Sequence, residues 1–362
     1  MKKFFSYLGL MAGLLLVTGA GCLSLKSSND PSTTGPAGMF VSPDRGETWG
    51  QIVSLPKAEG VSSLANVSVY RVIEDPQDPK AMYWLSRGEG FFFSYDEGET
   101  WQRPSGPLAS GFVYSIAVDP TDKCTLYGTN GLLVYRSDDC SRSWTEVYRE
   151  SRSDRVAAIA VNPFPPYELY VLKSGGDLLK SEDQGISWSV MQRFRQRVDH
   201  LIADHYQPGV LYIATRKNGM YRSVDMGETW EFLTEPISRF SGGTEYRRMF
   251  LHPTREGVIY WICTYGILVS EDSGETWRGM ELITPPGSAD IYAFAVNPTN
   301  DKEMYYTATV NYRSTFYKTV DGGENWITKK LPSGQVPTAL RVHPEQEQVV
   351  YIGFTIPPPE KK

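Results

Sequence analysis

Residues 223–230 read Ser-Val-Asp-Met-Gly-Glu-Thr-Trp, and variants of this short phrase recur throughout the chain. Successive copies start between 42 and 52 residues apart, a spacing typical of the four-stranded blades of a β-propeller. The seven copies are Ser42–Trp49, Ser94–Trp101, Ser137–Trp144, Ser181–Trp188, Ser223–Trp230, Ser270–Trp277 and Thr319–Trp326. They contain seven of the nine tryptophans, so one position of the repeat holds most of the largest core-forming side chains.

A second element recurs between the copies and predicts the rest of each blade. An apolar strand ends in Asp, Asn or His, and a tyrosine always stands eight residues later. The pairs are Asp75 and Tyr83, Asp119 and Tyr127, Asn162 and Tyr170, Asp204 and Tyr212, His252 and Tyr260, Asn297 and Tyr305, and His343 and Tyr351. The constant offset indicates a tight turn of one length between a first and a second strand. Because a Gly-containing turn then leads to a third strand, and a fourth strand follows the tryptophan, each unit is four antiparallel strands.

The two ends of the chain each supply half of a blade. The phrase at Ser42 has no first and second strands before it, whereas the segment Ala339–Phe354 has these two strands but no phrase after it. We therefore predict an all-β fold, a single seven-bladed β-propeller over residues 39–356 with a short tail over 357–362. Its last blade combines third and fourth strands from the N-terminus with first and second strands from the C-terminus. Such closure removes free sheet edges.

The N-terminus has the features of a secretory signal. Lys2 and Lys3 precede an apolar run over residues 4–17, and small residues then lead to Cys22. This arrangement resembles a bacterial lipoprotein signal, which implies lipidation of Cys22 and an extracytoplasmic protein anchored to a membrane of the cell envelope. An ordinary cleaved signal and an uncleaved anchor helix are the alternatives. We expect a signal peptide over residues 1–21 and a flexible, lipid-anchored tether over residues 22–38.

Composition and cysteine usage limit the classes of protein and of binding site that the chain can represent. The 362-residue chain is 41% hydrophobic and has a net charge of −6 with no long basic run, which favours one folded domain and argues against nucleic-acid binding. No Cys/His grouping has zinc-ligand spacing, so we expect neither a metal nor a cofactor, and we expect a monomer.

Cys124 and Cys140 fall in two loops at the same end of one blade. A disulfide between them and two free thiols both remain open.

The repeated phrase resembles the Asp-box, also called the BNR repeat. That motif occurs in bacterial sialidases, xyloglucan-cleaving hydrolases, the sortilin N-terminal domain and the photosystem II assembly factor family, where it forms a hairpin loop between the third and fourth strands. Asp and Ser side chains accept hydrogen bonds from nearby N–H groups, and Gly supplies a positive φ. Seven equivalent copies around a ring indicate a structural role, rather than metal binding or catalysis, for Asp44, Asp96, Asp139, Asp183, Asp225, Asp272 and Asp321.

Arginines concentrate in three consecutive loops that join one blade to the next. The strand order places these blade-connecting loops on the face opposite the Asp-boxes, where ligand-binding residues are expected. The candidate binding residues are Arg149, Arg152, Arg155, Arg193, Arg195, Arg197, Arg239, Arg247, Arg248 and Tyr246. They predict a docking surface for an acidic protein or peptide, or for an anionic glycan. The alternative is a solvated set of loops balanced by Glu150, Asp154, Asp199 and Glu245.

Two classes of function follow from the resemblance. Single extracytoplasmic propellers of the photosystem assembly factor family imply protein or peptide binding without catalysis. Sialidases and xyloglucan-cleaving enzymes imply a carbohydrate-active hydrolase, but the former have six blades and the latter use two propellers. A glycosidase also needs two carboxylates at a defined separation, and nothing in the repeats singles out such a pair. The sequence therefore favours a membrane-tethered binding or assembly scaffold, with a glycosidase as the alternative.

Overall fold

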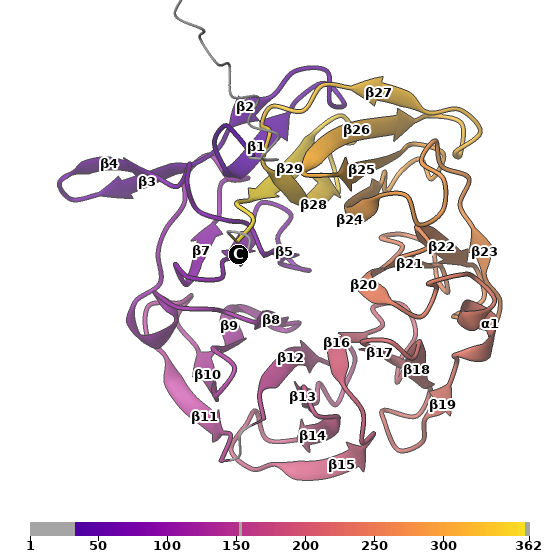
Figure 1. Ribbon diagram of the computed structural model, residues 1–362. Helices are drawn as coiled ribbons and strands as arrows, with labels where there is room; N and C mark the ends of the chain where they lie inside the picture. Colours follow the sequence, from indigo (N-terminus) through magenta and orange to yellow (C-terminus); the bar gives the residue numbers. More distant parts are fainter. Residues whose placement is uncertain (1–32, 152–153, 359–362) are drawn as a thin grey trace, which may run out of the picture. The chain divides into compact units, whose positions relative to one another are not determined.

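The structure is a computed structural model that describes residues 33–151 and 154–358, and it confirms the seven-bladed β-propeller (Figure 1). The predicted signal peptide, Cys22 and Arg152 lie outside the described residues. Helix is limited to α1 (Glu235–Ser238) and the 3-10 helix η1 (Gly106–Leu108) in the described ranges. Within these ranges, no helix has the length and apolarity needed to cross a membrane.

Five blades are formed from consecutive stretches of four antiparallel strands. The first two contain β8 (Ser115–Asp119), β9 (Asp122–Thr129), β10 (Leu133–Ser137) and β11 (Thr145–Arg149), then β12 (Val156–Val161), β13 (Leu169–Lys173), β14 (Asp177–Ser181) and β15 (Ser189–Arg193). The next contains β16 (Val198–Ala203), β17 (Leu211–Thr215), β18 (Met220–Ser223) and β19 (Glu231–Phe232). The last two contain β20 (Tyr246–Leu251), β21 (Ile259–Cys263), β22 (Ile267–Ser270) and β23 (Arg278–Gly279), then β24 (Asp290–Val296), β25 (Met304–Val310), β26 (Arg313–Thr319) and β27 (Ile327–Lys329).

One blade has a reduced outer strand. It contains β5 (Arg71–Glu74), β6 (Met82–Leu85) and β7 (Phe91–Ser94), and its fourth strand consists of one bridge between Phe93 and Gln102. Pro104 follows closely and cannot donate to a strand ladder. Before this blade, a hairpin of β3 (Ser54–Lys57) and β4 (Gly60–Ser63) projects away from the ring (Figure 1). This insertion accounts for the 52-residue interval between the first two Asp-boxes, the longest in the chain.

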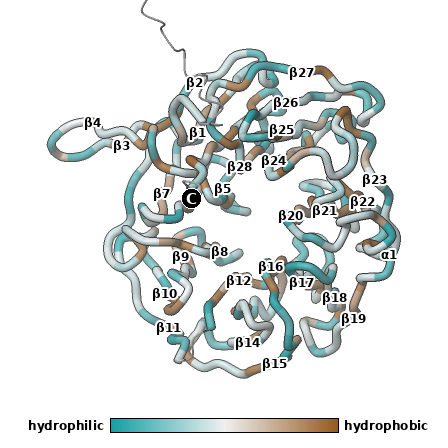
Figure 2. The backbone as a smooth tube through the Cα atoms, in the orientation of Figure 1, coloured by the Kyte–Doolittle hydropathy of each residue, from teal (hydrophilic) through white to brown (hydrophobic). Residues whose placement is uncertain are grey.

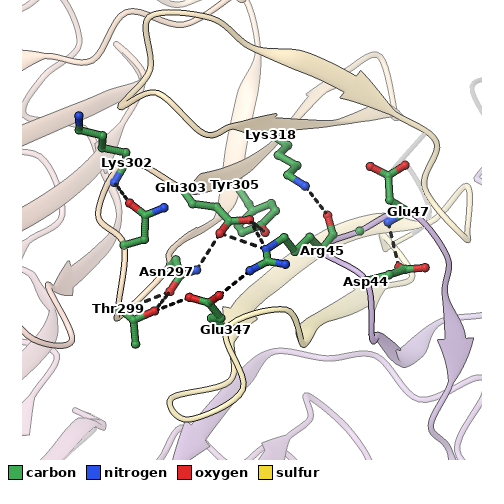
Figure 3. Close-up of polar contacts among 12 residues, drawn as sticks. Asp44, Arg45, Glu47, Asn297, Thr299, Lys302, Glu303, Tyr305, Lys318 and Glu347 are labelled. Atoms are coloured by element: carbon green, nitrogen blue, oxygen red, sulfur yellow. Dashed lines mark hydrogen bonds and ion pairs between the residues drawn. The ribbon is translucent and has the colours of Figure 1, made fainter.

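Strands from both ends of the chain close the ring as predicted. β1 (Gly38–Ser42) pairs with β29 (Val350–Thr355), while β2 (Gly50–Gln51) and β28 (Val336–Val342) complete the sheet. Arg45 of the first Asp-box ties this blade to its neighbour. Its Nε lies 3.2 Å from Glu303 Oε1, and its Nη2 lies 2.6 Å from Glu347 Oε1 (Figure 3). The closing blade is therefore held by a strand ladder and by ion pairs.

The core lies within and between the blades, and hydrophobic residues recur in each of them (Figure 2). The tyrosines at the constant offset are buried on the second strands, including Tyr83, Tyr170 and Tyr305, which are fully enclosed. The Asp-box tryptophans connect neighbouring blades. For example, Trp188 Nε1 donates to the carbonyl of Val147 at 2.9 Å. The two repeated elements thus supply the core of each blade and the contacts between blades.

Each Asp-box is a hairpin loop held by its own aspartate. In the fifth copy, Asp225 Oδ1 accepts from Ser223 Oγ at 2.7 Å and from the Thr229 N–H at 2.9 Å, and Thr229 Oγ1 donates to Oδ2 at 2.5 Å. The glycine of this copy, Gly227, has φ +89. In the third copy, Ser141 occupies the glycine position and adopts φ +69. These contacts are those expected of a loop that stabilises the fold.

The hydrogen bonds to the Asp-box carboxylates should make stability depend on pH. The hydrogen bond from the Thr48 hydroxyl lowers the pKa of Asp44 from 3.8 to about 2, and Ser187 has the same effect on Asp183. Because the folded protein binds these protons less readily than the unfolded chain, their stabilisation is complete above about pH 4 and is lost as the pH falls towards about 2. Thermal unfolding across this range should show a falling midpoint, with a smaller slope for Asp183→Asn. A midpoint constant from about pH 5 to about pH 2 would contradict the prediction.

The two cysteines left open by the sequence lie together in the structure. A disulfide joins Cys124, on β9, to Cys140, in the Asp-box of the same blade. Cys263 lies on β21 and is fully buried, and its burial raises the pKa of the thiol to about 11. Cys263 is therefore a core residue, as its position in an apolar strand indicates.

Candidate functional site

The centre of the ring contains a polar cavity of about 620 Å³, lined in part by the blade-connecting loops. Eight cationic side chains line this cavity, which we call the basic basin. They are Arg71, Arg87, Arg155, Arg197, Arg216, Lys217, Arg247 and Arg248. In the described part of the chain, Asp199 and Glu245 are the acidic residues of its lining. The basin therefore carries a large excess of positive charge, although the whole chain is acidic.

Three kinds of element position the basin cations. Arg71, Arg247 and Arg248 lie on β5 and β20, which are first strands and therefore line the centre of the ring (Figure 1). Arg155 and Arg197 lie in blade-connecting loops, directly before β12 and β16. The remaining three lie in turns between second and third strands: Arg87, Arg216 and Lys217. Because blade-connecting loops and these turns share one face of a propeller, the cations converge.

Six of the eight cations have no ion pair with the residues that the structure describes. Arg216 donates two hydrogen bonds to Asp199, from Nε to Oδ2 at 2.8 Å and from Nη2 to Oδ1 at 2.9 Å. Arg247 Nη2 lies 2.5 Å from Asp290 Oδ1. The other six are Arg71, Arg87, Arg155, Arg197, Lys217 and Arg248. Uncompensated cations in a concave site favour an anionic ligand.

Arg71 and Arg248 lie at the inner end of the basin. Both also line a second cavity of about 380 Å³, whose wall is largely apolar and includes Met249 and Leu340. Their guanidinium carbons lie 5.3 Å and 5.8 Å from the centre of the Tyr70 ring. The two cation–π contacts partly stabilise the positive charges of these arginines. Desolvation, followed by the positive charge of Arg71, lowers the pKa of Arg248. Two like charges held this close are costly by themselves, and an anion would relieve that cost.

Aromatic side chains form part of the basin wall. Phe112 and Tyr114 stack with their ring centres 4.0 Å apart, and Phe112 meets Tyr70 edge-on at 4.9 Å. Arg155 Nη1 donates to the Tyr114 hydroxyl at 2.8 Å. The rings therefore orient the basin arginines without neutralising them.

A histidine and a tyrosine lie beside the inner arginines. The Tyr246 hydroxyl and His200 Nδ1 are 2.8 Å apart. Desolvation, followed by the charges of Arg71 and Arg248, lowers the pKa of His200 well below 6.5. His200 is therefore neutral at neutral pH, and the positive charge of the basin comes from its arginines and its lysine.

The structure brings half of the predicted binding residues into the basin, namely Arg155, Arg197, Arg247, Arg248 and Tyr246. Arg195 lines two smaller cavities beside it. Three others do not line the basin and pair with local acids: Arg149 with Glu146 at 2.5 Å, Arg193 with Asp177 at 3.8 Å and Arg239 with Glu235 at 2.8 Å. These three arginines extend from loops and outer strands, so solvent and neighbouring carboxylates satisfy them.

Two of the four acids expected to balance the arginine loops, Asp199 and Glu245, line the basin, and Asp154 lines the adjoining cavity. Glu150 lies 3.0 Å from Lys173 Nζ, and Asp154 accepts from the Ser174 hydroxyl at 2.6 Å. Glu245 Oε2 accepts from the Thr264 hydroxyl at 2.7 Å. Eight cations against two acids in the described lining still leave the basin with an excess of positive charge.

Four basin cations were not predicted from the sequence: Arg71, Arg87, Arg216 and Lys217. The prediction rested on the blade-connecting loops and left out the turns on the same face. A signal existed at Arg216 and Lys217, because they directly precede the turn residues Asn218 and Gly219. Arg71 also had a signal, because it interrupts the apolar run Val69–Ile73 with a charge on a first strand.

The fold and the basin define a single propeller with a cationic central site, and comparisons with known proteins agree with the propeller fold. A family model described as sortilin, neurotensin receptor 3 (Sortilin-Vps10) matches residues 176–281. A xyloglucanase from Paenibacillus sp is 22% identical over 267 residues, covering 67% of this chain and 23% of the enzyme. The photosystem II assembly lipoprotein Ycf48 of a Picosynechococcus species is 25% identical over 153 residues, covering 41% of this chain and 42% of that protein.

A solved structure of Ycf48 bound to D1 peptide is similar in fold. It superimposes with a TM-score of 0.58 at 15% identity, covering 82% of this chain and 94% of that chain. The chain thus resembles sortilin-type and Ycf48 propellers. It spans about a quarter of the xyloglucanase and less than half of the Ycf48 lipoprotein in the matched regions. At these identities the structural likeness shows the fold alone.

Proposed function

We propose that this protein is an extracytoplasmic binding or assembly scaffold, tethered to the membrane through Cys22, that holds an acidic segment of a partner protein in the basic basin. The observation that carries the proposal is the group of six basin cations without an ion pair in the described ranges. A Ycf48 structure with a bound D1 peptide supports a peptide as the class of ligand. The description of another Ycf48 relative as a lipoprotein supports the tether.

The basin favours binding over glycoside hydrolysis. A glycosidase needs one carboxyl group that gives a proton and a second carboxylate across the cleft. Asp199 is held by Arg216, and Glu245 accepts a hydrogen bond from Thr264. Xyloglucan is uncharged, so the positive charge of the basin would add nothing to its recognition.

Charge reversal in the basin tests the proposal. Arg155 and Arg197 are exposed and line the basin. The double variant Arg155→Glu/Arg197→Glu should therefore keep its fold and bind an acidic peptide about 10-fold or more weakly than the unmodified protein. Fluorescence anisotropy with a labelled peptide of alternating Asp and Gly would measure this, and raising the salt concentration should also weaken binding.

The matched control is Arg193→Glu/Arg239→Glu, which makes the same change of charge at exposed arginines outside the basin. Equal weakening by the two double variants, or no binding of acidic peptides by the unmodified protein, would contradict the proposal. Stronger competition by polygalacturonate than by unlabelled peptide would assign the basin to an anionic glycan instead.

A further inference from the structure

Two smaller cavities continue the basic basin towards the outer strands of one blade. The first, of about 450 Å³, shares Arg155, Ser174 and Arg197 with the basin. The second, of about 440 Å³, shares Lys217 with the basin and shares Arg195 and Gln196 with the first cavity. The shared lining residues make the three cavities neighbours, and we describe them together as one hollow from the centre of the ring to β19.

The outer end of this hollow is lined by three aromatic side chains, Phe194, Tyr221 and Phe232, which we call the aromatic shelf. The rings of Tyr221 and Phe232 stack with centres 4.5 Å apart and planes inclined by 27°. The Phe194 ring lies 4.5 Å from that of Tyr221. Phe232 is 45% exposed although it is large and apolar, so its contact surface is open to a ligand.

The aromatic shelf is rigidly supported from below. Phe194 meets Trp230 of the Asp-box edge-on, with ring centres 5.1 Å apart. The Phe194 N–H donates to the carbonyl of Gly176 at 2.8 Å. A side chain on Gly176 would come within 2.7 Å of the Gln196 carbonyl oxygen, so the two loops are in close contact. A contact surface that is held in place loses little entropy when a ligand binds.

The link between the basin and the aromatic shelf is cationic and polar. Arg195 has φ +53, a left-handed conformation that costs a non-glycine residue free energy and that clusters at ligand-binding sites. Gln196 accepts from Asn218 Nδ2 at 2.8 Å and donates to the Tyr221 hydroxyl. Lys217 and Arg195 both line the second cavity, and Lys217 also lines the basin. A chain that crosses from the basin to the shelf therefore passes these two cations.

We propose that one acidic peptide occupies the whole hollow, with its carboxylates in the basic basin and an aromatic side chain stacked on the aromatic shelf. This inference rests on the proposed function, because the basin supplies the first contact. Charge complementarity selects an acidic chain, since Arg195 and Lys217 line the second cavity. The exposed ring faces select a flat apolar side chain, because stacked aromatic pairs add to the free energy of burial. The partner is thus a protein segment in which an aromatic residue follows or precedes a group of acidic residues.

Two sets of acidic peptides with equal charge test this proposal. Each carries a pair of Asp residues, and each has either Phe or Ala at a position three to six residues away. We expect the best Phe peptide to bind about 10-fold more tightly than its Ala counterpart. In Phe232→Ala the Phe peptide should lose this advantage, while the Ala peptide binds as before. The control is Tyr167→Ala, an exposed aromatic residue in the turn between β12 and β13 on the Asp-box face.

The possible failures are distinguishable. Equal binding of Phe and Ala peptides at every spacing contradicts the binding of an aromatic side chain on the aromatic shelf, but it does not contradict peptide binding in the basin. Equal weakening of both peptides by Phe232→Ala also overturns it, because that result indicates a structural change. Failure of both peptides to bind overturns the proposed function and this inference together. Binding of a neutral oligosaccharide that is lost in Phe232→Ala, without preference for the Phe peptide, assigns the shelf to a sugar and overturns the peptide.

Discussion

Replacement of Arg248 by glutamine should weaken the binding of an acidic peptide by about 10- to 100-fold, because a hydrogen bond to a charged group contributes about 1.5–3 kcal/mol. The same variant should unfold at an unchanged or higher temperature. Arg248 has no ion pair in the described ranges, and desolvation, followed by the positive charge of Arg71, lowers its pKa. Removing one of two neighbouring like charges relieves repulsion in the free protein, and glutamine keeps a donor for the Tyr70 carbonyl. The residue would thus serve binding at the expense of stability.

The matched control for this prediction is Arg278→Gln. Arg278 is an exposed arginine on β23 that pairs with Glu271 at 3.2 Å, away from the basin. The Arg278→Gln substitution should change neither the peptide affinity nor the unfolding temperature by a measurable amount. Titration calorimetry and differential scanning fluorimetry measure the two quantities. An Arg248→Gln protein that binds normally, or that unfolds at a clearly lower temperature, would show that Arg248 serves the fold.

A chain that ends at Val349 should lack a cooperative unfolding transition. It loses β29, in which Tyr351, Ile352 and Phe354 are almost completely buried. Burial of each such side chain contributes about 1.5–3 kcal/mol, against a total stability of about 5–15 kcal/mol for a domain. β1 and β28 would also lose their common partner and become exposed edges that promote association. Circular dichroism melts and size-exclusion chromatography check both effects.

A chain that ends at Pro358 is the control, because it keeps the whole of β29. It should melt like the full-length protein and elute at the volume of a single propeller. If the chain ending at Val349 behaves in the same way, the last blade contributes little to the cooperativity of the ring.

The fold was largely predictable because the residues that build it repeat. Trp188 and Tyr170, for example, each have counterparts in the other blades, and a constant offset such as that from Asn162 to Tyr170 reports the length of a turn. Two deviations had no such signal. The β3–β4 hairpin is an insertion without counterpart, and the reduced fourth strand near Gln102 depends on a local proline. Features that occur once leave no periodicity to detect.

The site was half predictable for the same reason. Arg155 and Arg197 were found because they lie in loops whose place on one face follows from strand order. Arg71 was missed because the prediction considered the loops and left out the first strands, which line the centre of the ring. Arg193, a candidate from these loops, does not line the basin, because loop composition does not distinguish a residue near the centre from one that pairs with Asp177 on its own blade. Distance from the ring axis is a property of packing, and the repeat does not encode it.

The pairing of β1 with β29 also sets the order of events when the chain is made. Residues Gly38 and Phe354 face each other in one ladder, whereas each of the other blade sheets draws its strands from one uninterrupted stretch. Synthesis proceeds from the N-terminus, so β1, the first strand of the ring to be made, can pair with β2 early but waits for β29 until the end. The loop that this contact closes is almost the whole domain, and such long-range pairing is slow. The ring is therefore sealed only after translation has delivered its final strand, and a chain interrupted before that moment remains open to proteases.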